Sequence, residues 1–141
     1  MRVADILKKK GSSVVTLPST ATVSQLLATL ADHKIGAVVA PAEDRVVGVA
    51  SERDVVHHLR AGRDQSSALS DLMSVDVQSA TAHDDLDQLA VTMTEQRIRH
   101  LPVIEDGALK GIVSIGDVVK AIMSDQELVI EQLEKYINGQ R

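Results

Sequence analysis

The chain carries the same seven-residue pattern twice. The sequence GVASERD occupies positions 48–54 and GIVSIGD occupies positions 111–117, so a glycine, a serine and an aspartate recur 63 positions apart. Other residues keep the same shift, for example Gln25 with Gln88. A single register held over so long a stretch predicts a duplicated fold.

The segments that lead into the two repeats match at a different shift. The sequence ADIL at positions 4–7 corresponds to SDLM at positions 70–73, 66 positions later. The difference places a three-residue change of length in the loop between Lys8 and Ser13, where a duplicated fold tolerates it. We therefore divide the chain into repeat 1 (residues 1–61), a linker (62–68), repeat 2 (69–123) and a C-terminal helical tail (124–141).

The length of the chain argues against two independent domains. A chain of 141 residues is one ordinary domain, whereas units of about 60 residues bury too little surface to be more than marginally stable alone. We expect the two repeats to share a core and to form one compact module.

Hydrophobic patterning predicts a mixed α/β (α+β) fold in which each half is a short amphipathic segment followed by β-α-β-β-α. Capping-box spacing marks the internal helices, as in Thr22 with Gln25, and Ser124 with Glu127 predicts a further helix that ends before Gly139. Short β-branched runs predict strands at residues 14–17, 37–40, 45–50, 77–80, 101–104 and 109–113.

Composition restricts the function. The net charge of −5 and a single tyrosine disfavour binding of nucleic acid by a broad basic surface or by base stacking. No apolar run is long enough to span a membrane, no signal peptide is recognisable, and there is no cysteine, so we expect a soluble cytoplasmic protein. The adjacent pair His57 and His58 lacks metal-ligand spacing and is expected on a helix surface.

The serine and aspartate of each repeat have two possible roles. A serine at a strand-to-helix turn with an aspartate three residues later is a helix cap, and spacing alone favours that role. The free N–H groups of the same helix end attract anions, and the carboxylate can accept hydrogen bonds from a ribose diol. The duplication of the whole pattern shifts the balance towards a nucleotide-binding site.

Three segments resemble a known family. The two heptapeptides, together with IRHLPVI at positions 98–104, are similar to the hallmarks of CBS domains, the cystathionine β-synthase type, arranged as a tandem pair or Bateman module. The likeness extends from about Val3 to Met123 and suggests a small stand-alone protein. It implies two clefts between the repeats that hold an adenine nucleotide, with AMP first, then ATP or ADP, NAD(H) and S-adenosylmethionine, and it implies a homodimer.

The resemblance also implies two unequal clefts. Arg99 and His100 form a basic cluster beside a signature, which is either a solvated strand entry or a phosphate site, whereas Gly36 and Ala37 stand at the matching positions of repeat 1. We therefore rank the first cleft above the second. By analogy the first cleft combines Ser114, Asp117, Arg99 and His100 with Thr16, Ala21, Ile35 and Gly36. The second combines Ser51, Asp54 and Arg53 with Ser79 and Ile98.

Three classes of function remain. The favoured one is a regulatory module whose adenine-nucleotide occupancy changes its contacts with a regulated protein. The second is a nucleotide-independent dimerisation or scaffold module that acts through its surface and its C-terminal helix. An enzyme is the least favoured, because no nucleophile with a base, no metal cluster, no Rossmann fingerprint and no Walker loop is present, so we expect no catalytic cofactor.

Overall fold

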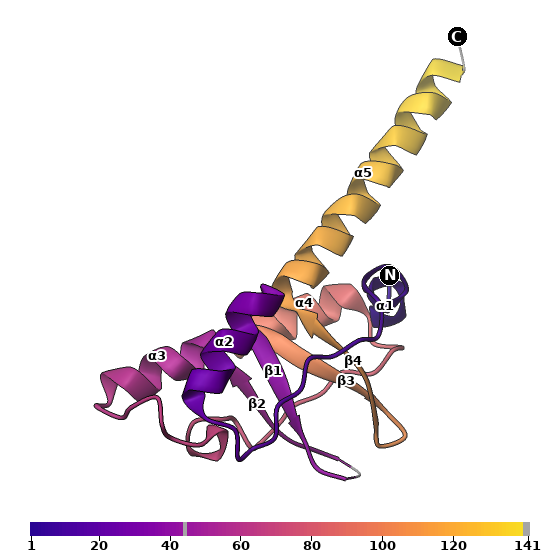
Figure 1. The fold of residues 1–141 in the computed structure, drawn as a ribbon. Helices are drawn as coiled ribbons and strands as arrows, with labels where there is room; N and C mark the ends of the chain where they lie inside the picture. Colours follow the sequence, from indigo (N-terminus) through magenta and orange to yellow (C-terminus); the bar gives the residue numbers. More distant parts are fainter. Residues whose placement is uncertain (44, 140–141) are drawn as a thin grey trace. The chain divides into compact units, whose positions relative to one another are not determined.

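The computed structural model describes residues 1–43 and 45–139, which form helices and two small sheets (Figure 1). The mixed α+β class predicted from the sequence is confirmed. The elements in chain order are α1 (Val3–Lys10), α2 (Val23–His33), β1 (Ala37–Pro41), β2 (Val46–Ser51), α3 (Glu52–Arg60), the 3₁₀ helix η1 (Leu69–Asp71), α4 (Leu86–Glu95), β3 (His100–Glu105), β4 (Ala108–Ser114) and α5 (Ile115–Gly139).

The chain forms two compact units that are not contiguous in sequence. Unit 1 consists of Met1–Ser12, Ala80–Val103 and the chain from Gly111 onward, and unit 2 consists of Ser13–Ser79 with Ile104–Lys110. The leading segment of repeat 1 thus belongs to the unit built mainly from repeat 2. The leading segment of repeat 2, which contains η1, belongs to the unit built mainly from repeat 1.

Matching backbone hydrogen bonds hold these two leading segments, which we call the exchanged segments because each belongs to the unit built mainly from the other repeat. Val3 N donates to Asp84 O at 3.0 Å in unit 1, and Leu69 N donates to Ala21 O at 2.8 Å in unit 2. Two further bonds repeat in the same way, from Ala4 N to Ala82 O and Leu86 N to Met1 O in unit 1, and from Ser70 N to Ser19 O and Val23 N to Ser67 O in unit 2. The shift of 66 between the leading segments therefore reflects equivalent packing.

The two sheets are antiparallel pairs, β1 with β2 and β3 with β4. The strands predicted at residues 14–17 and 77–80 do not form; only single parallel bridges remain, from Thr16 to Val39 and from Ala80 to Val103. Proline explains the short ladders, because it lacks an N–H donor. Pro18 follows the first bridge, and Pro102 accepts a hydrogen bond from Ala80 but cannot return one.

Each unit has its own apolar core. In unit 1 the side chains of α1, α4, β3, β4 and α5 pack together around the fully buried Val3, Val103 and Val113. In unit 2 the side chains of α2, β1, β2, α3 and η1 pack around Leu26 and Leu69. The exchanged segments supply residues to both cores, so neither repeat builds a core from its own sequence alone.

The signature glycines lie beneath side chains of the exchanged segments. A Cβ on Gly111 would lie 2.7 Å from Cδ2 of Leu7, and a Cβ on Gly48 would lie 2.5 Å from Sδ of Met73. These separations are shorter than van der Waals contact, so an added Cβ at either position would require the side chain of Leu7 or Met73 to move. Leu7 and Met73 are matched residues of the two leading segments.

Three sequence-based predictions about helices are wrong. Residues 115–139 form one continuous helix, so the separate helix expected from Ser124 does not exist; no proline or glycine between Asp117 and Asn138 interrupts the helix. His58 was expected at the surface but is 5% exposed, and its Nε2 lies 3.0 Å from the carbonyl oxygen of Asp64. His57 is exposed as expected. The helix was expected to end before Gly139, but α5 includes Gly139, which is the last described residue.

None of the helices among residues 1–43 and 45–139 is both long enough and apolar enough to cross a bilayer.

Candidate functional site

The signature turn of unit 1 joins β4 to α5 through a reciprocal pair of hydrogen bonds. Ser114 N donates to Oδ2 of Asp117 at 2.9 Å, and Asp117 N donates to Oγ of Ser114 at 3.0 Å. Both residues are half-buried. This is a capping box, which satisfies two of the free N–H groups at the start of a helix and fixes the carboxylate beside that helix end.

The signature turn of unit 2 repeats this geometry between β2 and α3. Ser51 N donates to Oδ2 of Asp54 at 2.9 Å, and Asp54 N donates to Oγ of Ser51 at 3.3 Å. The hydroxyl of Ser51 also lies 3.0 Å from Oδ2 of Asp54. The helix-cap interpretation is therefore confirmed in both units. A carboxylate has about four acceptor sites, so the cap leaves acceptor capacity for a ligand.

A second repeated hydrogen bond joins each signature turn to the strand beside it. Ile115 N donates to the carbonyl of Arg99 at 2.8 Å, and at the matching positions Glu52 N donates to the carbonyl of Gly36 at 3.0 Å. The backbone of Arg99 is thereby fixed next to the turn that carries Asp117. Arg99 is exposed and His100, the first residue of β3, is half-buried. Unit 1 thus places the backbone of one predicted basic residue, Arg99, beside its signature turn.

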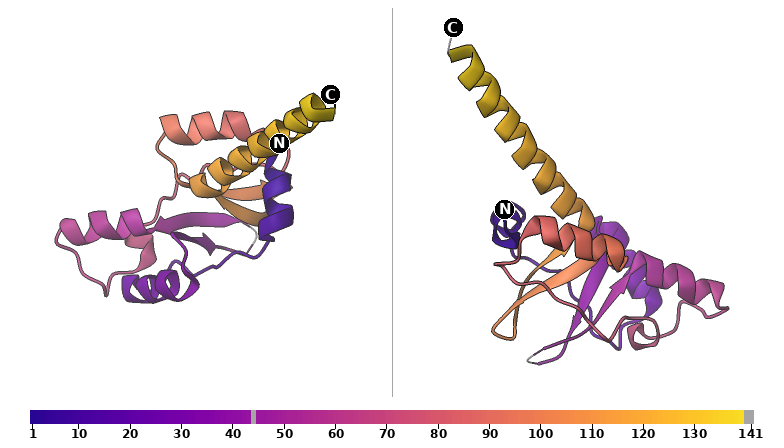
Figure 2. Two further views of the ribbon diagram at one scale, coloured as in Figure 1. Left: turned by 90° about the horizontal axis from the view of Figure 1, so that it is seen from above. Right: turned by 180° about the vertical axis from the view of Figure 1, so that it is seen from behind.

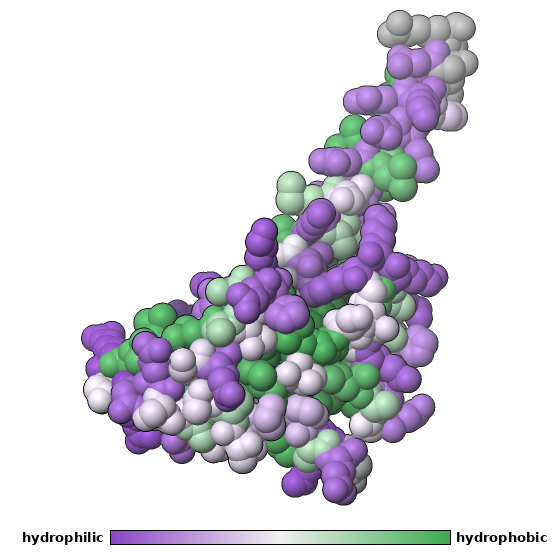
Figure 3. Space-filling view, in the orientation of Figure 1, coloured by the Kyte–Doolittle hydropathy of each residue, from purple (hydrophilic) through white to green (hydrophobic). Residues whose placement is uncertain are grey.

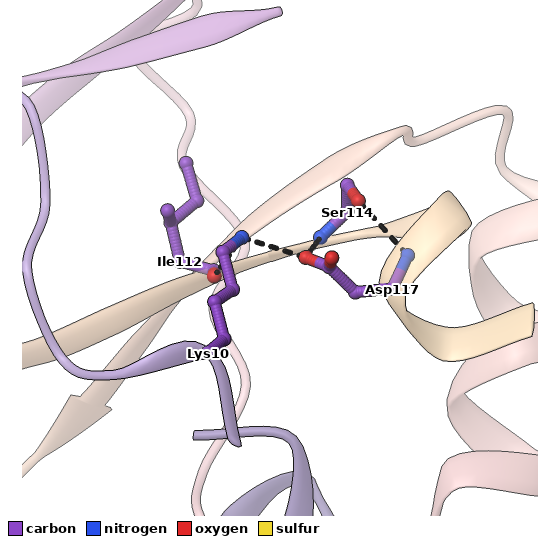
Figure 4. Close-up of polar contacts among 4 residues, drawn as sticks. All are labelled: Lys10, Ile112, Ser114 and Asp117. Carbon is purple, nitrogen blue, oxygen red and sulfur yellow. Dashed lines mark hydrogen bonds and ion pairs between the residues drawn. The ribbon is translucent and has the colours of Figure 1, made fainter. Parts of the chain in front are cut away.

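Lys10 is a residue of this site that the sequence did not reveal. Its Nζ lies 2.6 Å from Oδ2 of Asp117 and donates to the carbonyl of Ile112 at 3.0 Å (Figure 4). The side chains of Lys10 and Asp117 are 37% and 27% exposed. The last residue of α1 in repeat 1 therefore pairs with the signature aspartate of repeat 2. The correspondence between the two leading segments is compatible with a position of Lys10 near Gly111. Only the structure shows the ion pair between Lys10 and Asp117.

The environment of Asp117 lowers its pKa. Burial alone would raise the pKa, but the hydrogen bond from Lys10, the backbone hydrogen bond from Ser114 and the charge of Lys10 outweigh burial and lower it below the ordinary value of 3.8. Asp117 is thus held as a carboxylate. Sixty-six positions after Lys10 stands Asp76, and the hydrogen bonds recorded for the Asp54 side chain among the described residues come from Ser51. Among the described residues, the signature aspartate thus has an ion pair in unit 1 and none in unit 2.

The remaining predicted site residues are distributed over both units. Thr16 is exposed, Ala21 is buried and Ile35 and Gly36 are half-buried, all in unit 2. Exposed Arg53 and Ser79 also belong to unit 2, whereas half-buried Ile98 belongs to unit 1. Each of the two predicted clefts combines residues of different units, so the composition of both clefts stays a prediction.

Comparison with known proteins gives one family for both repeats. The CBS domain model matches residues 3–61 and residues 69–124. The mitochondrial CBS domain-containing protein CBSX3 of Arabidopsis thaliana is 31% identical to the chain, over 97% of the chain and 72% of that protein.

Solved structures agree with this match. The crystal structure of the CBS-domain containing protein ATU1752 from Agrobacterium tumefaciens has a TM-score of 0.83 and 40% identity, and the similarity covers 86% of this chain and 98% of that one. The CBS domain protein PAE2072 from Pyrobaculum aerophilum, solved in complex with AMP, has a TM-score of 0.74 and 28% identity, with 83% and 89% covered.

Proposed function

Because the chain belongs to the CBS-domain family, we propose that it is a regulatory module that binds an adenine nucleotide at its signature turns. The observation that carries the proposal is the reciprocal Ser–Asp box, present at the start of a helix in both units. It fixes a carboxylate, which suits a ribose diol, beside the N-terminal end of a helix, whose positive dipole end attracts anions.

In the proposed complex the turn of unit 1 binds more tightly than that of unit 2. Asp117 accepts hydrogen bonds from the ribose hydroxyls with the acceptor sites that Ser114 and Lys10 leave, while Arg99 and His100 bind phosphate. In unit 2 the positions that match these two basic residues hold Gly36 and Ala37, and Arg53 is the nearby cation in sequence. Phosphate should bind more weakly there, because fewer side chains can form charged hydrogen bonds to it and these bonds are stronger than neutral ones.

The proposed ligands are AMP first, then ATP or ADP, NAD(H) and S-adenosylmethionine. Support for AMP comes from the related protein of Pyrobaculum aerophilum, whose structure holds AMP. We propose that ligand occupancy alters contacts with a regulated protein, that the module is a homodimer in the cytoplasm, and that it has no catalytic activity of its own. Thr16, Ala21, Ile35, Gly36, Ser79 and Ile98 remain proposed contributors to the adenine sites.

The proposal is tested by calorimetric titration of the full chain with AMP. We expect Asp117→Ala to abolish the tighter binding event and Asp54→Ala to preserve it. Asp117→Asn separates charge from folding, since it keeps the shape and part of the capping ability; its affinity should fall sharply while its thermal unfolding changes little. Absence of binding by the wild-type chain to all of the proposed nucleotides would reject the proposal.

A scaffold function is the second candidate, because the Ser–Asp boxes already satisfy the helix starts and Lys10 already pairs with Asp117. In that case the signatures act as caps, and the exposed helix α5 recruits a partner. A wild-type chain that binds no nucleotide but dimerises or captures one defined protein would favour this candidate over the sensor.

A further inference from the structure

Helix α5 presents an apolar stripe that no described residue covers. Val119, Met123, Gln126, Ile130, Leu133 and Ile137 follow one another at alternating spacings of four and three residues, so they lie along one face of the helix. Five of the six are apolar, and these are exposed by between 45% (Val119) and 61% (Ile137). Figure 3 shows apolar residues along this helix between hydrophilic ones. We call these six residues the α5 stripe.

The helix leaves its own unit after about two turns. Val118 is buried in the core of unit 1 and Ile122 is half-buried against it, whereas residues 123–138 are all exposed. In Figures 1 and 2 the last turns of α5 extend beyond α1 and α4 of the same unit. A helical stretch of this length is only marginally stable in water without packing, so its apolar face needs a partner.

We infer that the α5 stripe binds the α5 stripe of a second copy of this chain in an antiparallel pair. This arrangement sets Val119 opposite Ile137, Met123 opposite Leu133 and Gln126 opposite Ile130, each pair occurring twice by symmetry. The spacing of the stripe is that of a coiled-coil seam, and a seam from Val119 to Ile137 is about 27 Å long. Gln126 lies near the centre, where a polar side chain fixes the register.

Charge complementarity selects the antiparallel direction. Lys120, Glu127 and Glu134 flank the stripe on one side. In the antiparallel pair Lys120 of each copy faces Glu134 of the other, which gives two attractive pairs against one repulsive pair of Glu127 residues. In a parallel pair these side chains would face Ile115, Ile122 and Val129, with no opposite charge. Opposed helix dipoles add to the preference.

The charges also disfavour a lipid surface as the occupant. The part of α5 from residue 119 to residue 139 carries Lys120 and Lys135 against Asp125, Glu127, Glu131 and Glu134, a balance of two positive and four negative charges. Helices that lie on anionic membranes carry Lys and Arg on their polar face. A second copy suits this helix better, because the same chain supplies both the apolar seam and the matching cation.

The first test compares two equivalent substitutions in the full chain by sedimentation velocity over a dilution series. Leu133→Glu places a charge in the stripe, and Leu128→Glu places the same charge on the same helix outside it; both leucines are exposed, by 56% and 53%. We expect Leu133→Glu to raise the dimer dissociation constant about tenfold or more and Leu128→Glu to change it little. A monomeric wild-type chain, or equal effects of the two variants, would overturn the inference.

The second test addresses the charge pairs. Lys120→Glu and Glu134→Lys should each weaken the dimer a few-fold, and the double variant, in which the charges are exchanged, should recover most of the affinity. Lys135→Glu, on another face of the helix, is the matched control and should have no effect. Failure of the double variant to exceed both single variants would rule out the antiparallel register.

The third test uses the absence of cysteine from the chain. Mixed Met123→Cys and Leu133→Cys chains should form a disulfide-linked heterodimer under mild oxidation, because these positions are opposite only in the antiparallel pair. Preferential self-linking of Met123→Cys chains, whose two copies lie about 15 Å apart along the antiparallel pair, would instead indicate a parallel pair and contradict the inference. Co-sedimentation of the wild-type chain with phosphatidylserine vesicles that Leu133→Glu abolishes, without a dimer in solution, would identify lipid as the occupant.

Discussion

The side-chain nitrogen of Lys10 lies 2.6 Å from the carboxylate of Asp117, although 107 positions separate the two residues in the chain. The contact joins the end of the first helix to the signature turn of the second repeat. It gives the proposed ribose-binding carboxylate a partner that any ligand has to share or displace.

Replacing Lys10 should therefore affect ligands with and without phosphate differently. We expect Lys10→Met to tighten adenosine binding a few-fold, because Oδ2 of Asp117 then has one donor fewer and the exposed ion pair is worth at most about 1 kcal/mol. AMP should gain less, since the substitution also removes a positive charge near the phosphate. Calorimetric titrations with both ligands measure this difference. Weaker adenosine binding by the variant would show that Lys10 holds Asp117 in its binding position.

Replacing Arg99 should weaken the binding of AMP but not that of adenosine. A hydrogen bond to a charged group contributes roughly 1.5–3 kcal/mol, so Arg99→Ala should weaken AMP binding about tenfold or more. Adenosine, which lacks phosphate, should bind the variant as it binds the wild type. Arg53→Ala, at the turn of unit 2, is the control for the tighter binding event and should leave it unchanged. An equal loss for AMP and adenosine would assign Arg99 a structural role.

The lowered pKa of Asp117 predicts a dependence of stability on pH. A carboxyl whose folded pKa lies below its unfolded value of about 3.8 contributes stability that is fully present above that value and is lost as the pH falls through the folded pKa. The difference in unfolding free energy between the wild type and Asp117→Asn, which is expected to be small, should therefore be constant near neutral pH and disappear as the pH falls below about 4. Urea unfolding at a series of pH values measures it. A difference that grew on acidification would contradict the assignment.

The signature glycine of repeat 2 should be sensitive to a single added methyl group. Gly111→Ala requires the end of the Leu7 side chain to move, and because that end is flexible the cost should lie near the lower limit of about 1–3 kcal/mol for overpacking. In a Leu7→Ala background the same substitution should cost much less, because the space is then free. Chemical denaturation of the four chains gives the coupling energy. A cost that persists in the Leu7→Ala background would locate the strain elsewhere.

The features that the sequence predicted best are those encoded by neighbouring residues. Capping boxes need only a hydroxyl or carboxyl and a partner three residues away, so Ser51 with Asp54 and Ser114 with Asp117 were identified correctly. Ser124 shows the limit of that signal. The same residue type inside an apolar helical pattern does not start a new helix when the preceding turn already supplies the hydrogen-bonding carbonyls.

Contacts between distant segments could not be predicted in the same way. The two repeats offer similar surfaces, so the pattern around Val3 is equally compatible with packing on either repeat. Lys10 is an exposed lysine in a run of three, and no local periodicity distinguishes it from Lys8 or Lys9. The basic residues Arg99 and His100 were found because they lie close to a signature in the sequence. Which residues of the other unit complete each proposed cleft depends on the arrangement of the two units, which the sequence pattern does not give.

The exchange of leading segments makes each repeat depend on the other for a complete core. A chain cut in the turn after Gly62 would yield one fragment carrying α1, which belongs to the core of unit 1, and another carrying η1, which belongs to the core of unit 2. Neither fragment contains a complete core. The two fragments would therefore have to associate, so that each supplies the segment that the core of the other lacks. Loss of one repeat by deletion would likewise remove part of the core that the remaining repeat needs.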